Sequence, residues 1–355
     1  MEEDVYRRLA RRLDAIPNGF PATESGIELR LLAKLFTPQE AELAAQMNLS
    51  LETPEAIAGR VGADPQQTAR TLKEMARKGL IRYRRGEGTL LFALMPFVVG
   101  IYEEQLPRMD RELAELVEAY FSDPATRPLL GVAPAIHRVV PVDEAVPFNL
   151  EILAYERASA LVESARAWGV RDCICRVQQK LIGKGCDHLL EVCLNLAPVE
   201  GAFDGSLSTR AISKEEALHL LRAAEEDGLV HTVGNYQDGH FYICNCCPCC
   251  CAVLRAVTEY QVPNAVAHSG FLAVVDEAEC IGCGECVERC PLAALSLPED
   301  VARVNQARCV GCGVCTVTCP TGAIGLQRRA DAPEPPPANL KEWMARRAQA
   351  RGMAI

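Results

Sequence analysis

The stretches CIGCGECVERCPLAALSL (residues 280–297) and CVGCGVCTVTCPTGAIGL (residues 309–326) decide the fold of their part of the chain. They resemble each other along their whole length. Each carries four cysteines, and the last of the four is followed by proline. Two similar units in tandem predict a domain with approximate twofold symmetry. We expect this domain to span residues 264–329.

Both stretches space their cysteines as C-x2-C-x2-C-x3-C-P. Gaps of two residues let a turning loop point three sulfurs to one side, and the intervening glycines let the loop curl. A metal cluster held by four thiolates needs such convergence. Zinc is the alternative occupant, but zinc sites usually combine two separated C-x-x-C pairs, unlike this duplicated run.

Residues 271–327 resemble a bacterial-type ferredoxin domain with two [4Fe-4S] clusters. The resemblance implies that three cysteines of one run and the last cysteine of the other run hold each cluster. One implied set is Cys280, Cys283, Cys286 and Cys319, and the other is Cys309, Cys312, Cys315 and Cys290. Clusters with four thiolates leave no iron open to a substrate, so the domain is expected to carry single electrons.

Ten further cysteines precede this domain, in a chain with 18 cysteines altogether. In a cytoplasmic protein, which we expect here, so many thiols indicate metal binding and not disulfides. We expect a cysteine-rich metal-binding domain over residues 170–263. Its candidate ligands are Cys173, Cys175, Cys186, Cys193, Cys244, Cys246, Cys247, Cys249, Cys250 and Cys251.

The densest stretch is CNCCPCCC, residues 244–251. In an extended segment Cys244 and Cys246 share one face. Pro248 favours the first position of a helix, which would place the following three cysteines in its first turn. Cys193 and Cys250 also fit plain core positions, because apolar neighbours stand at helical spacing from them.

The two cysteine segments of this domain resemble iron–sulfur proteins of anaerobes that combine C-x-C-R…G-x-x-C…C and C-N-C-C-x-C-C-C segments with a C-terminal ferredoxin domain. The resemblance implies cluster binding and no particular reaction. We predict one or two further [4Fe-4S] clusters with ligands from both segments. A zinc site and a redox-active thiol pair are the rivals.

Residues 1–121 contain no cysteine and look helical. Helix starts are predicted at Thr37, Thr53 and Asp64, followed by two strands within 81–94 and a long helix near 102–121. This order resembles a winged helix-turn-helix domain. Its basic residues are Arg70, Lys73, Arg77 and Lys78 in the expected second helix and Arg82, Arg84 and Arg85 in the expected wing.

The remaining segments are a predicted helical connector over residues 122–169, which ends in a helix at 152–169, and a tail over 330–355. The tail begins with a proline-rich linker and ends in a short basic helix. Another helix is predicted after Ser213. Together these segments predict a multidomain α+β protein.

Composition narrows the function further. A net charge of −10 and a pI near 5.3 disfavour a general nucleic-acid or membrane binder. The longest apolar run, residues 90–102, is too short to span a bilayer, and the N-terminal stretch does not resemble a secretory signal. His188, His231, His240 and His268 are scattered, although His188 lies near Cys186. The sequence contains no Rossmann-type glycine fingerprint, so it does not indicate a flavin or nicotinamide site.

The sequence therefore predicts an electron carrier that serves a redox partner or the subunits of an oxidoreductase. One alternative is a redox-sensing transcription regulator that uses the winged helix, although the acidic chain favours protein docking over DNA binding. Another is a reductase with its active site at a cluster of the cysteine-rich domain.

Overall fold

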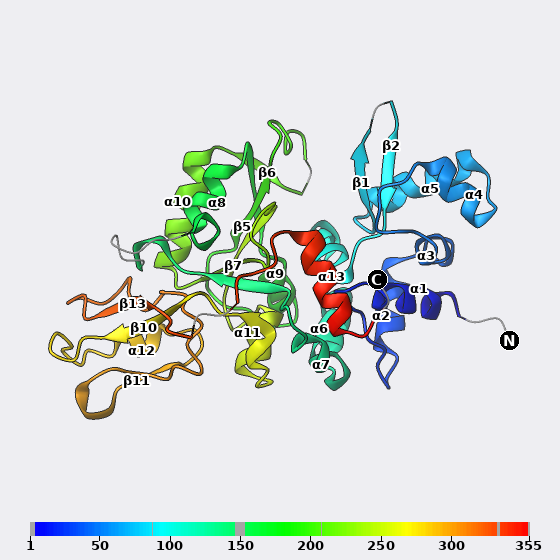
Figure 1. Ribbon diagram of the computed structural model, residues 1–355. Helices are drawn as coiled ribbons and strands as arrows, with labels where there is room; N and C mark the ends of the chain where they lie inside the picture. Colours follow the sequence, from blue (N-terminus) through cyan, green and yellow to red (C-terminus); the bar gives the residue numbers. More distant parts are fainter. Residues whose placement is uncertain (1–3, 87, 146–152, 207, 332–333, 354–355) are drawn as a thin grey trace. The chain divides into compact units, whose positions relative to one another are not determined.

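The computed structural model describes residues 4–86, 88–145, 153–206, 208–331 and 334–353. The chain forms two compact units, one of Met1–Leu129 with Arg347–Ile355 and the other of Leu130–Arg346. Both contain helices and strands (Figure 1), which confirms the α+β prediction. In the described ranges no helix is long and apolar enough to cross a membrane.

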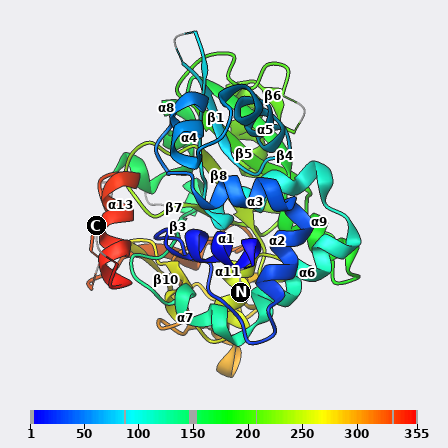
Figure 2. The ribbon, with the colours of Figure 1, turned by 90° about the vertical axis from the view of Figure 1, so that its right-hand side faces the viewer.

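The first unit consists of helices and one hairpin. Its elements are α1 (Val5–Asp14), α2 (Ile27–Leu35), α3 (Pro38–Ala45), α4 (Pro54–Val61), α5 (Pro65–Arg77), β1 (Arg82–Arg85), β2 (Leu90–Ala93) and α6 (Arg111–Ser122). Short helical segments lie at Phe97–Ile101, Glu103–Arg108, Pro124–Thr126 and Arg127–Leu130. Figure 2 shows α4 and α5 beside the hairpin.

Local signals of this unit are confirmed. Thr37, Thr53 and Asp64 each accept a hydrogen bond from a backbone N–H of the helix they precede. The predicted hairpin forms, with β1 antiparallel to β2. The long helix was predicted too early, because it begins at Arg111 after a 3-10 segment that contains Pro107. The winged-helix interpretation of these elements stays a prediction.

The tail forms the predicted C-terminal helix, α13 (Leu340–Ala350). Arg347 in this helix is fully buried. It donates hydrogen bonds to the carbonyl oxygens of Pro17 at 3.0 Å and Leu129 at 2.8 Å. The end of the helix is therefore anchored on this chain.

The second unit is built on a seven-stranded sheet in the order β6-β4-β5-β8-β7-β3-β9. The strand pairs are antiparallel except for β3 with β9. The strands are β3 (His137–Val140), β4 (Ala167–Asp172), β5 (Glu191–Ala197), β6 (Arg210–Ile212), β7 (Val230–Gly234), β8 (Tyr242–Cys246) and β9 (Val266–Ala267). The helices are α8 (Ala158–Ser164), α9 (Ile174–Leu181), α10 (Lys214–Glu226) and α11 (Ala252–Thr258), with 3-10 turns at Asp143–Ala145, Ala154–Glu156 and Pro263–Ala265.

This sheet changes the expected organisation of the connector. The range 122–169 contributes β3 and the start of β4, so it is not purely helical. The helix predicted over 152–169 is short, because α8 ends at Ser164 and the chain then enters the sheet. The helix predicted after Ser213 is confirmed as α10, with the Ser213 side chain as its cap.

The two faces of the sheet differ in chemistry because side chains alternate along a strand. Leu194, Val233 and Ile243 lie in a core with α8 and α10. Cys193 and Cys244 stand one residue away and therefore point to the opposite face, which we call the cysteine face. The prediction that Cys244 and Cys246 share a face is thus confirmed by β8.

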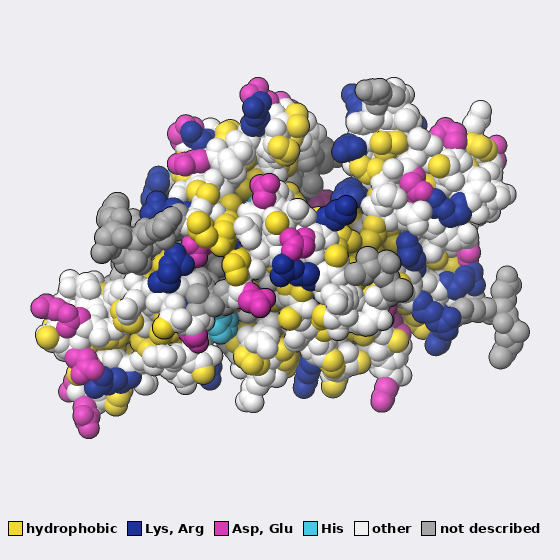
Figure 3. Space-filling view, viewed as in Figure 1, with side chains coloured by type: hydrophobic (Ala, Val, Ile, Leu, Met, Phe, Trp, Pro, Cys, Tyr) yellow, Lys and Arg dark blue, Asp and Glu magenta, His cyan; other side chains and the backbone are white. Residues whose placement is uncertain are grey.

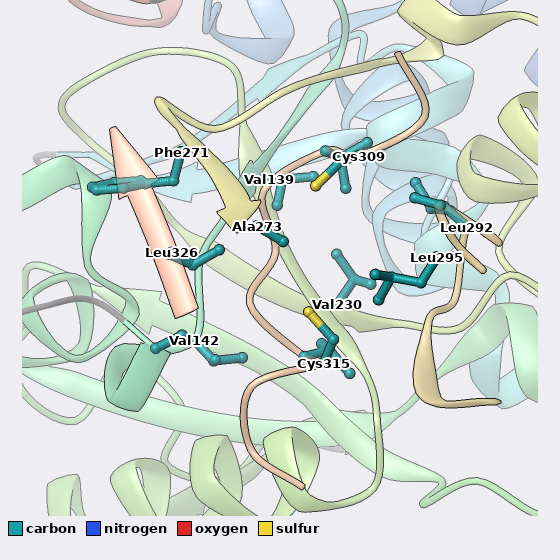
Figure 4. Close-up of a cluster of buried hydrophobic side chains, with 14 of the residues drawn as sticks. Val139, Val142, Val230, Phe271, Ala273, Leu292, Leu295, Cys309, Cys315 and Leu326 are labelled. Atoms are coloured by element: carbon teal, nitrogen blue, oxygen red, sulfur yellow. The ribbon is translucent and has the colours of Figure 1, made fainter. Parts of the chain in front are cut away.

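The C-terminal repeat packs on the cysteine face. It consists of β10 (Phe271–Val275), α12 (Glu285–Arg289), β11 (Leu295–Ser296), a 3-10 turn at Pro298–Asp300, β12 (Arg303–Val304) and β13 (Ile324–Arg328). The N–H of Val142 donates to the carbonyl oxygen of Cys312 at 2.9 Å. Figure 4 shows Val139 and Val230 of the sheet near Cys309 and Cys315 in one shared core.

Candidate metal centres

The first candidate centre is a cavity in the repeat domain. Cys280, Cys283, Cys286 and Cys319 line this cavity together. Cys283 is exposed and Cys286 is buried, so one side of the cavity reaches solvent. The N–H of Ala302 donates to the Cys280 sulfur at 3.5 Å.

The second candidate centre is a cavity lined by Cys290, Cys309, Cys312 and Cys315. The N–H of Ala294 donates to the Cys290 sulfur at 3.2 Å. The loop comes very close to the strand behind it, since a Cβ on Gly311 would lie 2.1 Å from the carbonyl oxygen of Phe271. Only glycine fits there, and its φ of +70° also disfavours other residues.

The two cavities fit iron–sulfur clusters in donor chemistry. Four thiols converge on each, and backbone N–H groups point at sulfur, as cluster sites require. Burial raises the pKa of Cys312 to about 12, so a bound cation is needed to hold its thiolate. Burial also raises the pKa of Cys319, but N–H groups of Ile324 and Thr321 and the Thr321 hydroxyl outweigh it and lower the pKa overall.

The middle cysteines form two groups. The six-cysteine group lies around the cysteine face of the sheet. Thiol–thiol hydrogen bonds connect its members in series, and Thr232 Oγ1 lies 3.4 Å from the Cys246 sulfur. Its members, in the order of these contacts, are Cys173, Cys175, Cys251, Cys246, Cys244 and Cys193.

The four-cysteine group consists of Cys186, Cys247, Cys249 and Cys250, whose sulfurs all lie within 4.8 Å of one another. The Cys186 sulfur is 3.9 Å from that of Cys247 and 3.5 Å from that of Cys250. The sulfurs of Cys249 and Cys250 are 4.0 Å apart. Cys249 is exposed, whereas Cys247 and Cys250 are buried.

CNCCPCCC therefore divides differently from the prediction. Pro248 does not begin a helix, because Cys251 takes an extended conformation and caps α11, which begins at Ala252. The N–H of Cys251 donates to the carbonyl oxygen of Cys247 at 3.1 Å, so residues 247–251 form a single closed turn. The turn brings the Cys251 side chain close to the sulfur of Cys246 in β8.

The alternative in which Cys193 takes a core position at helical spacing from its apolar neighbours does not hold, because this segment is a strand. Cys193 lies in β5, half-buried, and its sulfur faces Cys244 across the strand pair. Cys250 does lie in a core, with Val192 and Leu229, but in a turn and not in a helix.

Arg176 is a residue of this region that the sequence reasoning did not single out. It is 2 % exposed and lies against the Cys247 sulfur. Its guanidinium donates to the carbonyl oxygens of Leu189 at 2.8 Å and Asn245 at 2.9 Å. Burial lowers its pKa, but the charges of Cys173, Cys247 and Cys246 outweigh burial and raise it. Its only sequence signal is its place directly after C-I-C.

One thiol in each group has a lowered pKa: Cys246 in the six-cysteine group and Cys247 in the four-cysteine group. A hydrogen bond from Cys244 is the largest influence that lowers the pKa of Cys246, to about 6. A hydrogen bond from Cys250, opposed by burial and aided by Arg176, lowers the pKa of Cys247 to about 4. Thiolates are the form of cysteine that binds a metal ion.

Asn245 lies between Cys244 and Cys246 in β8, and its side chain points to the opposite face of the sheet. Its side chain donates to the carbonyl oxygen of Val192 at 2.7 Å and lies 2.6 Å from Nδ1 of the buried His231. The other ring nitrogen of His231 lies 3.1 Å from a Glu225 carboxylate oxygen. Asn245 therefore holds β8 to its neighbouring strands and does not belong to either cysteine group.

The histidines do not join the sulfur groups in the part of the chain that the structure describes. Nδ1 of His188 lies 3.2 Å from a carboxylate oxygen of Asp227, and the His188 side chain is partly exposed, in agreement with a place at the surface. His240 stacks on Tyr236 with ring centroids 4.8 Å apart.

A family model for a 4Fe-4S dicluster domain matches residues 273–326. No curated protein is similar enough to match the chain. The match identifies the C-terminal repeat as a 4Fe-4S dicluster domain, which makes this an iron–sulfur protein.

Proposed function

We propose that this protein transfers electrons between a partner docked at the exposed end of the dicluster domain and a third cluster in the six-cysteine group. One observation carries the proposal: Cys309 and Cys315 share a hydrophobic core with Cys246 and Cys251. The second cavity and the six-cysteine group therefore border the same buried core, from which water is excluded.

The ligand sets of the proposal are those that line the cavities. Cys280, Cys283, Cys286 and Cys319 hold one [4Fe-4S] cluster, and Cys290, Cys309, Cys312 and Cys315 hold another. The third cluster takes four ligands from the six-cysteine group: Cys173, Cys175, Cys246 and Cys251. When bound, each cluster accepts and releases one electron.

The exposed end of the dicluster domain fits a basic protein partner. Cys283 is exposed there, and the neighbouring Ile281 is 66 % exposed. Carboxylates surround this end, and Figure 3 shows acidic side chains gathered on it. They are Asp276, Glu277, Glu279, Glu285, Glu288, Glu299 and Asp300. A charged rim around an apolar contact raises the rate of productive encounter with an oppositely charged partner.

Anaerobic purification with iron and sulfide counts and electron paramagnetic resonance of the reduced protein tests the proposal. Three clusters predict about twelve iron atoms and about twelve sulfides per chain. Cys246→Ala is expected to remove roughly four of the iron atoms and to leave the signals of the dicluster domain. A count near eight that Cys246→Ala leaves unchanged would show that the six-cysteine group holds no cluster.

A second proposal, regulation of DNA binding, rests on the basic side chains of the first unit. Arg70, Lys73 and Arg77 on α5 are exposed, as are Arg82, Arg84 and Arg85 on β1, and Figure 3 shows basic side chains along this hairpin. Helices and wings with such charge contact phosphate in DNA complexes. A gel shift with genomic fragments, in oxidised and reduced protein and at two salt concentrations, separates this function from electron transfer alone.

A further inference from the structure

We propose that the four-cysteine group binds one zinc ion, at a site separate from every iron–sulfur cluster of the protein. The ligands are Cys186, Cys247, Cys249 and Cys250. The proposal does not rest on electron transfer, because a zinc count and an iron count are independent measurements.

The distances between the sulfurs carry the proposal. Zinc binds four thiolates tetrahedrally with Zn–S bonds of about 2.3 Å, so its ligand sulfurs lie about 3.8 Å apart. The measured separations from Cys186 are 3.5 Å to Cys250 and 3.9 Å to Cys247, and the separation from Cys249 to Cys250 is 4.0 Å. These values match the edges of a tetrahedron around one ion.

A cubane needs more room, because four iron atoms and four sulfides must fit between its thiolates. The dicluster domain provides the comparison within the same chain. Across the described residues, neither of its two cysteine sets forms a group whose sulfurs all lie within 4.8 Å, and the six-cysteine group does not either. The four-cysteine group is thus contracted to the size of a single ion.

The elements that provide the ligands fit a structural zinc site. Cys186 lies in the loop that follows α9, and the other three ligands lie in the turn between β8 and α11. The site joins sulfurs 61 and 64 residues apart along the chain. Four thiolates fill the coordination of zinc and leave no position for a substrate, so the ion would stabilise the fold and would not perform catalysis.

The charge balance of the site also fits. All four ligands bind zinc as thiolates, and the resulting complex carries two negative charges. The buried Arg176 lies against Cys247 and offsets part of this charge. Hydrogen bonds to the carbonyl oxygens of Leu189 and Asn245 hold the Arg176 guanidinium in this position.

The experiment uses the full chain, produced with iron and zinc both supplied and purified anaerobically. Mass spectrometry of the metals is expected to find about one zinc per chain, and zinc-edge X-ray absorption about four sulfur ligands near 2.3 Å. Cys249→Ala removes the exposed ligand and is expected to lower the zinc content at least roughly tenfold without lowering the iron content.

Cys283→Ala is the matched control, because Cys283 is also an exposed cysteine but lines a dicluster cavity. It is expected to lower the iron content by roughly four atoms and to leave zinc unchanged. Absence of zinc from the unmodified protein, oxygen or nitrogen ligands at the zinc edge, or zinc that survives Cys249→Ala would each overturn the proposal. A single iron atom in place of zinc would overturn it as well.

Discussion

The dicluster domain and the cysteine-rich part of the sheet domain both gather thiols, but by different means. In the dicluster domain, three cysteines of each cavity come from one short loop, and the fourth comes from the other repeat. In the sheet domain, the six-cysteine group draws on β5, β8, α9 and the caps of α9 and α11. One arrangement is local and repeated, whereas the other exists only after the sheet has formed.

This difference predicts different sensitivities. A loop that curls around its own ligands depends on backbone geometry at a few positions, of which Gly311 is the most constrained. A site assembled from distant strands depends on the groups that hold those strands together and balance the sulfur charges. Arg176 does both in the sheet domain.

The largest expected effect is that of Arg176→Met. The change removes a buried cation and leaves nearby thiolates without compensation, which typically costs about 3–5 kcal/mol. We expect loss of the metal of both middle groups and retention of the dicluster iron. Metal counts, together with denaturant unfolding followed by the fluorescence of Trp168 and Trp343, measure both effects.

The control is Arg303→Met in the dicluster domain, where the arginine is exposed and pairs with Glu277. Exposed pairs contribute little, so neither metal content nor stability is expected to change measurably. If Arg176→Met lost iron from the dicluster domain as readily as metal from the four-cysteine and six-cysteine groups, the two regions would not bind metal independently. The proposed difference between them would then be wrong.

A smaller effect is expected from Gly311→Ala. The added Cβ would meet the Phe271 carbonyl oxygen and the Ser269 hydroxyl, at a φ that other residues rarely adopt. Strain and overlap together cost about 2–4 kcal/mol. We expect the iron content to fall by roughly four atoms per chain from the second cavity, with the zinc content intact.

Gly322→Ala is the matched control, because Gly322 has the same φ of +70° and nothing within 4 Å of an added Cβ. It is expected to cost about 1 kcal/mol from backbone strain alone. Equal effects of the two changes would mean that the close approach at Gly311 is not what shapes the cavity.

The smallest expected effect is a loss of folding stability at acidic pH that comes from a histidine in the sheet. His137 in β3 is buried, and neither ring nitrogen has a partner among the described residues. Burial lowers its pKa from 6.5 to about 4. The unfolded chain then binds the proton more tightly, so stability is present above pH 6.5 and is lost as pH falls toward 4.

Between pH 7 and pH 5.5 this single group is expected to cost about 1 kcal/mol. Denaturant unfolding followed by tryptophan fluorescence measures the loss, and His137→Phe is expected to remove that part of it. Tyr242, whose ring centroid lies 5.7 Å from that of His137, leaves an aromatic neighbour for the substitute. An unchanged pH dependence in His137→Phe would assign the acid sensitivity to other groups.

Local signals predicted much of the fold correctly. The capping residues Thr37, Thr53, Asp64 and Ser213 each mark a helix start, and the hairpin follows from its turn. These features depend on residues within one turn of each other. The seven-stranded sheet could not be read in the same way, because β3 is separated from β7 by about ninety residues and joins it only by tertiary pairing.

The sequence alone determined the dicluster domain, because its ligands and its tight loops recur within two short repeats whose spacing dictates the convergence of sulfur. For the middle cysteines, the sequence predicted metal binding but did not establish it. Only the tertiary structure decided how CNCCPCCC is shared. Cys244, Cys246 and Cys251 join one group and Cys247, Cys249 and Cys250 the other, because a strand alternates its faces and the following turn folds back on itself.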